Sequence, residues 1–145
     1  MATAALRTRL DEYASVHRTA GNVACHWVGI PMIVIAIFGM LARVAVPVLP
    51  GVPLTAAEVL IAVALVYYAR LDAVLAAVMI PVVIAMDFLG HALPFWVNVA
   101  LFGIGWVFQL VGHTVYEKKS PAFLHNLVHL LIGPLFLLAK AVGRA

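Results

Sequence analysis

Long apolar stretches alternate with short polar breaks along most of the chain. A membrane-spanning helix needs about 20 predominantly apolar residues to cross ~30 Å of hydrocarbon. The pattern therefore predicts four transmembrane helices, at about residues 23–46, 54–69, 73–89 and 95–115, of which the second is short. A fifth apolar stretch, residues 123–142, is interrupted by Gly133-Pro134 and is predicted to be a re-entrant helix or a fifth span. We expect an all-α, polytopic helical bundle in which residues 1–145 form one membrane domain.

Residues 1–20 follow a different pattern, with apolar positions on one side only. That side ends in a histidine and carries Leu6, Leu10, Tyr13 and His17. Such one-sidedness is typical of an amphipathic helix that lies in the membrane interface. Gly21-Asn22 is predicted to end this helix, because glycine suits a helix C-cap and asparagine an N-cap. The chain then folds back into the first span.

Composition excludes an ordinary soluble domain, since 66% of the residues are hydrophobic, only 10% are charged and the mean hydropathy is +1.11. The net charge of +3 is small and dispersed, so we expect no nucleic-acid partner. Cys25 is the single cysteine, which excludes an internal disulfide and a cysteine-based metal cluster. Any metal here needs histidine, carboxylate or water ligands.

The basic residues of the loops predict the orientation in the membrane. They precede the first span, follow the second and follow the fourth, at Arg7, Arg9, Arg18, Arg70, Lys118 and Lys119. The other two loops contain none, which places the N-terminus in the cytoplasm. The membrane would be the inner membrane of a bacterium, or the endoplasmic reticulum of a eukaryote. Lys140 and Arg144 fit this orientation only if residues 123–142 do not cross the membrane fully.

Six histidines are unusual in so apolar a chain. Ionisable side chains at membrane depth are costly and usually mark a functional interior. The predicted topology gathers five of them at one membrane face, together with Glu117: His17, His26, His113, His125 and His129. His91 is placed at the opposite face, one helical turn after Asp87. That pair is predicted to be structural, with a second metal site as the alternative.

Spacing brings several of these residues together. Gln109, His113 and Glu117 recur every four residues and therefore form one stripe on a helix. The predicted break after His17 lets that residue converge with His26, and Gly112 allows a neighbouring helix to approach His113 closely. We therefore predict a metal site formed by His17, His26, His113 and Glu117. His125 and His129 are further candidates, as ligands, as residues that orient a ligand, or as interfacial residues.

Nitrogen and carboxylate ligands without thiolate suit non-haem Fe(II), Mn or Zn. The residues alone leave several functions open. Paired histidines on neighbouring spans also bind haem, a zinc site would favour a hydrolase, and a lipid transporter or scaffold would use the histidines only to join helices.

Two polar motifs carry a family resemblance. They read Tyr13-x3-His17-x4-Asn22-x3-His26 and Gln109-x2-Gly112-His113-x3-Glu117-x3-Pro121-Ala122. Together they resemble the Mpo-type membrane 2-hydroxy fatty acid dioxygenase family, which includes a yeast endoplasmic reticulum protein of phytosphingosine degradation and bacterial relatives. The middle spans match only as generic apolar helices.

The resemblance implies an Fe(II)-dependent dioxygenase that uses O₂ to shorten 2-hydroxy fatty acids by one carbon, an α-oxidation without 2-oxoglutarate. It places the metal on His17, His26, His113 and Glu117, with Tyr13, Asn22 and Gln109 around them. His113 and Glu117 are the expected catalytic residues, Glu117 as a fourth ligand or as the proton acceptor for the substrate hydroxyl. Substrate and membrane lipid are the expected partners, and the oligomeric state is left open.

Overall fold

Helices make up most of the described chain, as the all-α prediction requires. The computed structural model describes residues 3–47, 51, 54–119 and 128–144. In chain order the elements are α1 (Ala4–Ser15), α2 (Ala20–Leu41), β1 (Ala45–Val46), β2 (Leu54–Thr55), α3 (Ala56–Leu71), α4 (Ala73–Ala92), α5 (Phe95–Val111), the π-helix η1 (Gly112–Glu117) and α6 (Val128–Ala141). The two strands form a short antiparallel hairpin that pairs Ala45 with Thr55.

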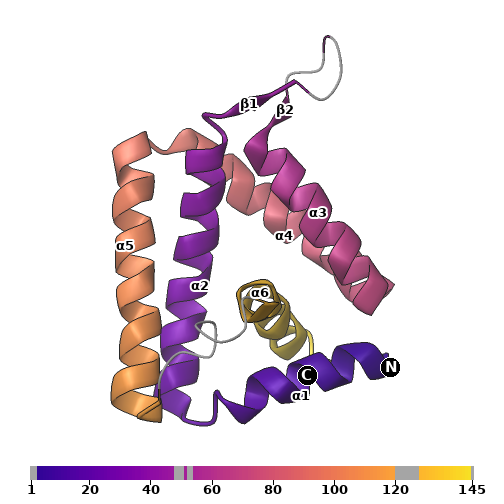
Figure 1. The fold of residues 1–145 in the computed structure, drawn as a ribbon, viewed down its shortest axis with the longest axis vertical. Coiled ribbons are helices and arrows are strands. Elements are labelled where there is room, and N and C mark those ends of the chain that lie inside the picture. The colour runs from indigo at the N-terminus through magenta and orange to yellow at the C-terminus, as the bar shows by residue number, and fades with distance from the viewer. Residues whose placement is uncertain (1–2, 48–50, 52–53, 120–127, 145) are drawn as a thin grey trace.

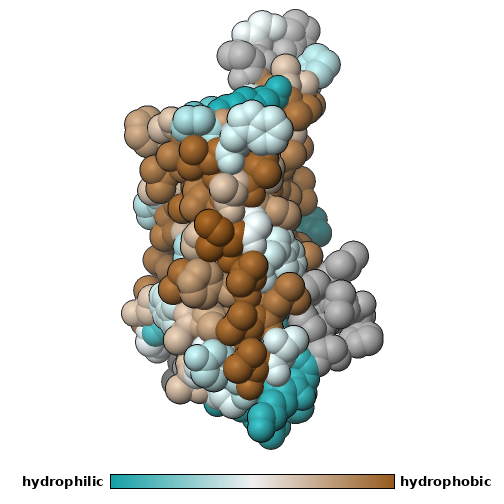
Figure 2. Space-filling view, turned by 90° about the vertical axis from the view of Figure 1, so that its left-hand side faces the viewer, coloured by the Kyte–Doolittle hydropathy of each residue, from teal (hydrophilic) through white to brown (hydrophobic). Residues whose placement is uncertain are grey.

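Three of the described helices are long and apolar enough to cross a membrane: α2, α4, and α5 continued by η1. The remaining predicted span, the second along the chain at residues 54–69, corresponds to α3, whose 16 residues extend only about 24 Å. That length falls short of the ~30 Å of hydrocarbon. Figure 2 shows the side of the molecule on which α5 lies, where apolar residues cover most of the height and polar residues gather near the ends. The chain is thus a helical membrane protein with three clear candidate spans.

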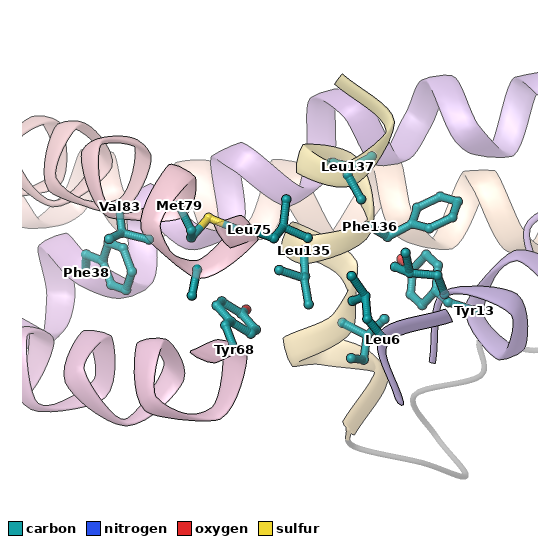
Figure 3. Close-up of a cluster of buried hydrophobic side chains, with 14 of the residues drawn as sticks. Leu6, Tyr13, Phe38, Tyr68, Leu75, Met79, Val83, Leu135, Phe136 and Leu137 are labelled. Carbon is teal, nitrogen blue, oxygen red and sulfur yellow. The ribbon is translucent and has the colours of Figure 1, made fainter. Parts of the chain in front are cut away.

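Two helix pairs form the frame of the fold. α2 packs against α5, and α4 packs against both α2 and α3. α1 crosses one end of this frame, whereas the β-hairpin lies at the other end (Figure 1). α6 runs crosswise to α2 in Figures 1 and 3 and is enclosed between the pairs and α1.

The most buried of the described helices is α6, which covers part of the stretch predicted to be a re-entrant helix or a fifth span. Its 14 described residues extend about 21 Å, and the choice between those two forms stays a prediction. Leu135, Phe136 and Leu137 are buried among side chains of α1 and α4 (Figure 3). The predicted apolar side of α1 is confirmed, but Leu6, Leu10 and Tyr13 join this protein core instead of facing lipid. Residues 123–127 lie outside the described part.

The break between the first two helices lies earlier than predicted. α1 ends at Ser15 and α2 begins at Ala20, so Gly21 and Asn22 belong to the first turn of α2. The N-cap is Thr19, whose side chain accepts a hydrogen bond from the Asn22 backbone N–H. Gly21 serves packing instead of capping, since a Cβ there would meet the Tyr116 ring at 2.2 Å.

The first and last described residues, Thr3 and Arg144, both lie at the end of the fold that carries α1. Arg144 pairs with Asp72 at 3.2 Å, and the Thr3 hydroxyl donates to the carbonyl oxygen of Leu71. The α3–α4 turn, α1 and the C-terminus therefore meet at one end. The cytoplasmic orientation stays a prediction.

Close packing of α2 on α4 depends on two facing glycines. A Cβ on Gly90 would lie 2.5 Å from the Ile35 carbonyl oxygen and 2.7 Å from the Gly39 backbone nitrogen. Both are backbone atoms, so the helices would have to move apart. We expect Gly90→Ala to lower the free energy of unfolding by about 1–3 kcal/mol. Thermal unfolding in detergent checks this. The control is Gly103→Ala, since a Cβ there meets nothing within 4 Å; an equal loss in both variants would contradict the packing argument.

Candidate metal centre

Three histidines from three different segments meet at the α1 end of the fold. His17 lies in the α1–α2 connection, His26 in the second turn of α2, and His113 in η1. All three side chains are buried, and each offers one nitrogen that lies within 4.8 Å of the other two. The predicted convergence of these histidines is confirmed. Residues 96 positions apart in sequence, His17 and His113, have ring centroids only 4.8 Å apart.

The protonation of His17 and His26 is fixed by backbone carbonyls. His17 Nδ1 lies 2.6 Å from the backbone carbonyl oxygen of Tyr13, and His26 Nδ1 lies 2.8 Å from the backbone carbonyl oxygen of Asn22. A carbonyl only accepts, so each Nδ1 carries the proton and each neutral ring keeps a lone pair on Nε2. These two Nε2 atoms face each other at 3.0 Å. Two lone pairs at that distance repel unless a cation is shared between them.

The geometry and the charge state both suit a metal ion. Two nitrogens bound at ~2.1 Å and at a right angle to each other lie roughly 3 Å apart, and the two Nε2 atoms are separated by 3.0 Å. Burial lowers the pKa of His17 to about 3, so this imidazole is neutral and able to ligate at pH 7. The carbonyl partners also hold both rings in orientation, as partners of metal-binding histidines commonly do.

A π-helical turn presents the third imidazole. η1 continues α5 with the wider π-helical backbone, a feature that often marks functional sites. The His113 ring is inclined by 68° to the His17 ring and by 81° to the His26 ring, so the three rings approach one point from different sides. Gly112 permits this approach, as predicted, because a Cβ there would lie 2.5 Å from Asn22 Oδ1. η1 ends where Lys118 adopts a left-handed backbone conformation with φ of 54°.

Glu117 is placed differently from the prediction that grouped it with the histidines. Its Oε1 accepts from the Arg18 backbone N–H at 3.0 Å. Its Oε2 accepts from the Thr19 N–H, the Thr19 hydroxyl and Asn22 Nδ2, at 3.1, 2.9 and 3.2 Å. The set of nitrogens within 4.8 Å of one another does not include this carboxylate. Glu117 therefore ties η1 to the N-terminus of α2, where the helix dipole favours an anion.

A cavity of about 120 Å³ adjoins the three imidazoles. Its polar part consists of Tyr13, His17, His26, Gln109, His113 and His129, and its apolar part of Ile30, Ile33, Val34, Ile37, Trp106, Leu130, Gly133 and Pro134. The α2 residues recur every three or four positions and form one stripe that leads away from His26. A ligand with a polar head and an apolar tail matches this division.

The other predicted site residues have separate positions. Tyr13 stacks on His17, with ring centroids 3.9 Å apart and planes inclined by 8°. Asn22 is fully buried and bonds to Glu117, while Gln109 lines the cavity. His129 also lines the cavity and meets the Tyr13 ring edge-on, but it is not in the three-histidine set. His125 lies outside the described residues.

Sequence reasoning missed the apolar wall and Thr19. Ile30, Ile33 and Ile37 look like any lipid-facing positions of a span, because an apolar side chain suits lipid and an acyl-binding cavity equally. Thr19 had a usable signal, since a threonine three residues before a buried polar position is a common N-cap.

A second group of ligand-type side chains lies towards the hairpin end. Glu58, Asp87 and His91 bring one ligand atom each within 4.8 Å of the others. His91 Nδ1 is 3.4 Å from Asp87 Oδ1, and Glu58 accepts from the Thr55 N–H in a capping box at the start of α3. The structural role of Asp87 and His91 and the alternative of a second metal site both stay predictions.

Comparison with known proteins gives two matches and one negative result. Residues 3–145 match the family described as "2-hydroxy-palmitic acid dioxygenase Mpo1-like". The chain is 34% identical over 139 residues to the 2-hydroxy-palmitic acid dioxygenase MPO1 of Saccharomyces cerevisiae, an alignment that covers 92% of this chain and 77% of the yeast protein. No solved structure matches.

Proposed function

The chain belongs to the Mpo1-like family of 2-hydroxy-palmitic acid dioxygenases, and from this premise we propose that it is an Fe(II)-dependent dioxygenase of 2-hydroxy fatty acids. The proposed reaction is an α-oxidation that consumes O₂, needs no 2-oxoglutarate and yields the fatty acid with one carbon fewer. The proposed place of reaction is the α1 end of the molecule, at the membrane surface.

The observation that carries the proposal is the pair of Nε2 lone pairs 3.0 Å apart, with His113 beside them. His17, His26 and His113 are proposed to hold the iron through neutral nitrogens. Bound iron would supply the activation of O₂, which organic side chains do not provide. Three protein ligands would leave coordination positions open for O₂ and substrate.

The apolar wall of the cavity supports a fatty acid as the substrate class. The tail is proposed to follow Ile30, Ile33 and Ile37 along α2, while the carboxylate and the 2-hydroxyl stay near the imidazoles. This arrangement keeps the charged head at the membrane surface and the tail at hydrocarbon depth, so neither part pays a large desolvation cost.

Removing the metal tests the reaction and its cofactor. We expect a chelator to abolish O₂ uptake with 2-hydroxypalmitate, and Fe(II) added under reducing conditions to restore it. Mass spectrometry should then find the 15-carbon acid in proportion to the O₂ consumed. Palmitate, which lacks the hydroxyl, is the matched control and should support no uptake.

Other outcomes of the same experiment identify the rival functions. Restoration of a hydrolytic activity by Zn(II), without O₂ uptake, would indicate a zinc hydrolase. A Soret band in the purified protein would indicate haem. Purified protein without stoichiometric metal, and without turnover after metal addition, would contradict the proposal and favour a lipid-binding or scaffold protein.

A further inference from the structure

The cavity lacks a cationic side chain for an acidic ligand. None of the described residues that line it is lysine or arginine. A carboxylate in such a place needs hydrogen-bond donors, because an anion that is removed from water without partners is strongly destabilised. A carboxylate in this cavity therefore needs a lining residue whose N–H or O–H group is not used in another hydrogen bond.

Two other lining atoms, Gln109 Nε2 and His129 Nδ1, are buried without a hydrogen-bond partner among the described residues, whereas the N–H groups of His17 and His26 are already used. His17 and His26 use their N–H groups on backbone carbonyls, and their Nε2 atoms carry lone pairs. Gln109 turns Nε2 towards α2, since a Cβ on Gly29 would lie 2.5 Å from that atom. Nε2 therefore lies against the neighbouring helix, where it has no hydrogen-bond partner among the described residues.

Tyr13 differs from these residues in both position and chemistry. Its side chain is 3% exposed and lines the cavity, and its hydroxyl bonds to none of the described residues. A Cβ on Gly133 would lie 3.2 Å from this hydroxyl oxygen and 3.0 Å from Ile30 Cδ1. The glycine thus keeps open the space where the hydroxyl meets the first residue of the apolar wall.

We infer that the Tyr13 hydroxyl binds the substrate carboxylate by donating a hydrogen bond at the junction of the imidazoles and the apolar wall. The inference rests on the proposed function for the identity of the substrate. A phenol donor binds the anion without adding a full positive charge beside the metal ligands. Stacking on His17 holds the ring and so fixes where the hydroxyl points.

The test is Tyr13→Phe, which keeps the stacked ring and removes only the donor. A hydrogen bond to a charged group contributes about 1.5–3 kcal/mol, so the Kd for 2-hydroxypalmitate should rise about 10- to 100-fold. The Kd is measured by calorimetric titration in detergent without O₂, and iron content and melting temperature are measured on the same samples. Both of these should match the wild type.

Two comparisons make the result specific. Wild-type protein should bind the acid more tightly than its methyl ester, and Tyr13→Phe should lose this preference. Tyr68→Phe is the matched control, because that buried hydroxyl donates to the Leu131 carbonyl and does not line the cavity; its Kd should stay unchanged.

Gly133→Ala is a second, independent variant. Its added methyl group enters the space beside the hydroxyl and should weaken binding of the acid while leaving iron content intact. An unchanged Kd in Tyr13→Phe, an equal rise in Tyr68→Phe, or loss of iron from Tyr13→Phe would each overturn the inference. Failure of the wild type to consume O₂ would instead contradict the proposed function, so the two failures are distinguishable.

Discussion

Replacing His113 with alanine is expected to abolish both iron binding and turnover. His113 is the only one of the three grouped histidines that comes from the C-terminal half of the chain. Without it, two nitrogens from the α1–α2 region remain, and the ion loses the ligand that joins this region to η1. Mutation of residues that only orient a metal ligand already lowers metal affinity or activity 10- to 100-fold. Loss of the ligand itself should therefore exceed about 100-fold.

Iron content by elemental analysis and O₂ uptake with 2-hydroxypalmitate check this expectation. His91→Ala is the matched control, because it removes a partly exposed histidine near the opposite end of the bundle, outside the cavity. It should retain iron and turnover. If His113→Ala kept either property at the wild-type level, the three-histidine centre would be wrong.

Glu117 is expected to give the second largest effect, and its variants separate a ligand from a residue that positions ligands. Glu117→Ala leaves four donor groups of the α2 N-terminus without their acceptor. We expect a loss of about 2 kcal/mol or more in unfolding free energy. The α1–α2 connection that carries His17 would lose its anchor, so turnover should fall at least about 10-fold.

Glu117→Gln retains one acceptor oxygen and a similar shape. If Glu117 positions the connection, this variant should keep stoichiometric iron and recover most of the stability and part of the turnover. Thermal unfolding, iron content and O₂ uptake are compared for both variants. Loss of iron from a Glu117→Gln protein that melts like the wild type would show that the carboxylate is a ligand after all.

Much of this centre could be predicted from the sequence, because polar residues are rare within membrane-spanning stretches. An imidazole in an apolar stretch needs a reason, so His26 and His113 stood out without any structure. The charge of the loops then placed them at one face, and the contact of His17 with His26 agrees with that placement. The close approach of α2 at Gly112 was also predictable, since small residues allow helices to pack closely.

Other features depend on packing between segments that are distant in sequence. The four-residue spacing of His113 and Glu117 predicts that both side chains bind one metal ion, yet the two side chains have different partners. His113 joins the histidine set and Glu117 caps α2, because η1 is π-helical and lies beside the α2 N-terminus. Periodicity assumes a regular α-helix, so it does not reveal such a local change of backbone.

The sequence by itself determined the membrane class and singled out the histidines that meet, since both follow from the cost of polar groups in hydrocarbon. Only the tertiary structure decided that α6 is a buried crosswise helix, that Glu117 bonds to the α1–α2 connection, and that Tyr13 and Gly133 border the cavity. The physical reason is that apolar side chains gain similarly from lipid and from protein neighbours. Hydropathy therefore predicts burial from water, but the choice between those two surroundings depends on how the helices pack.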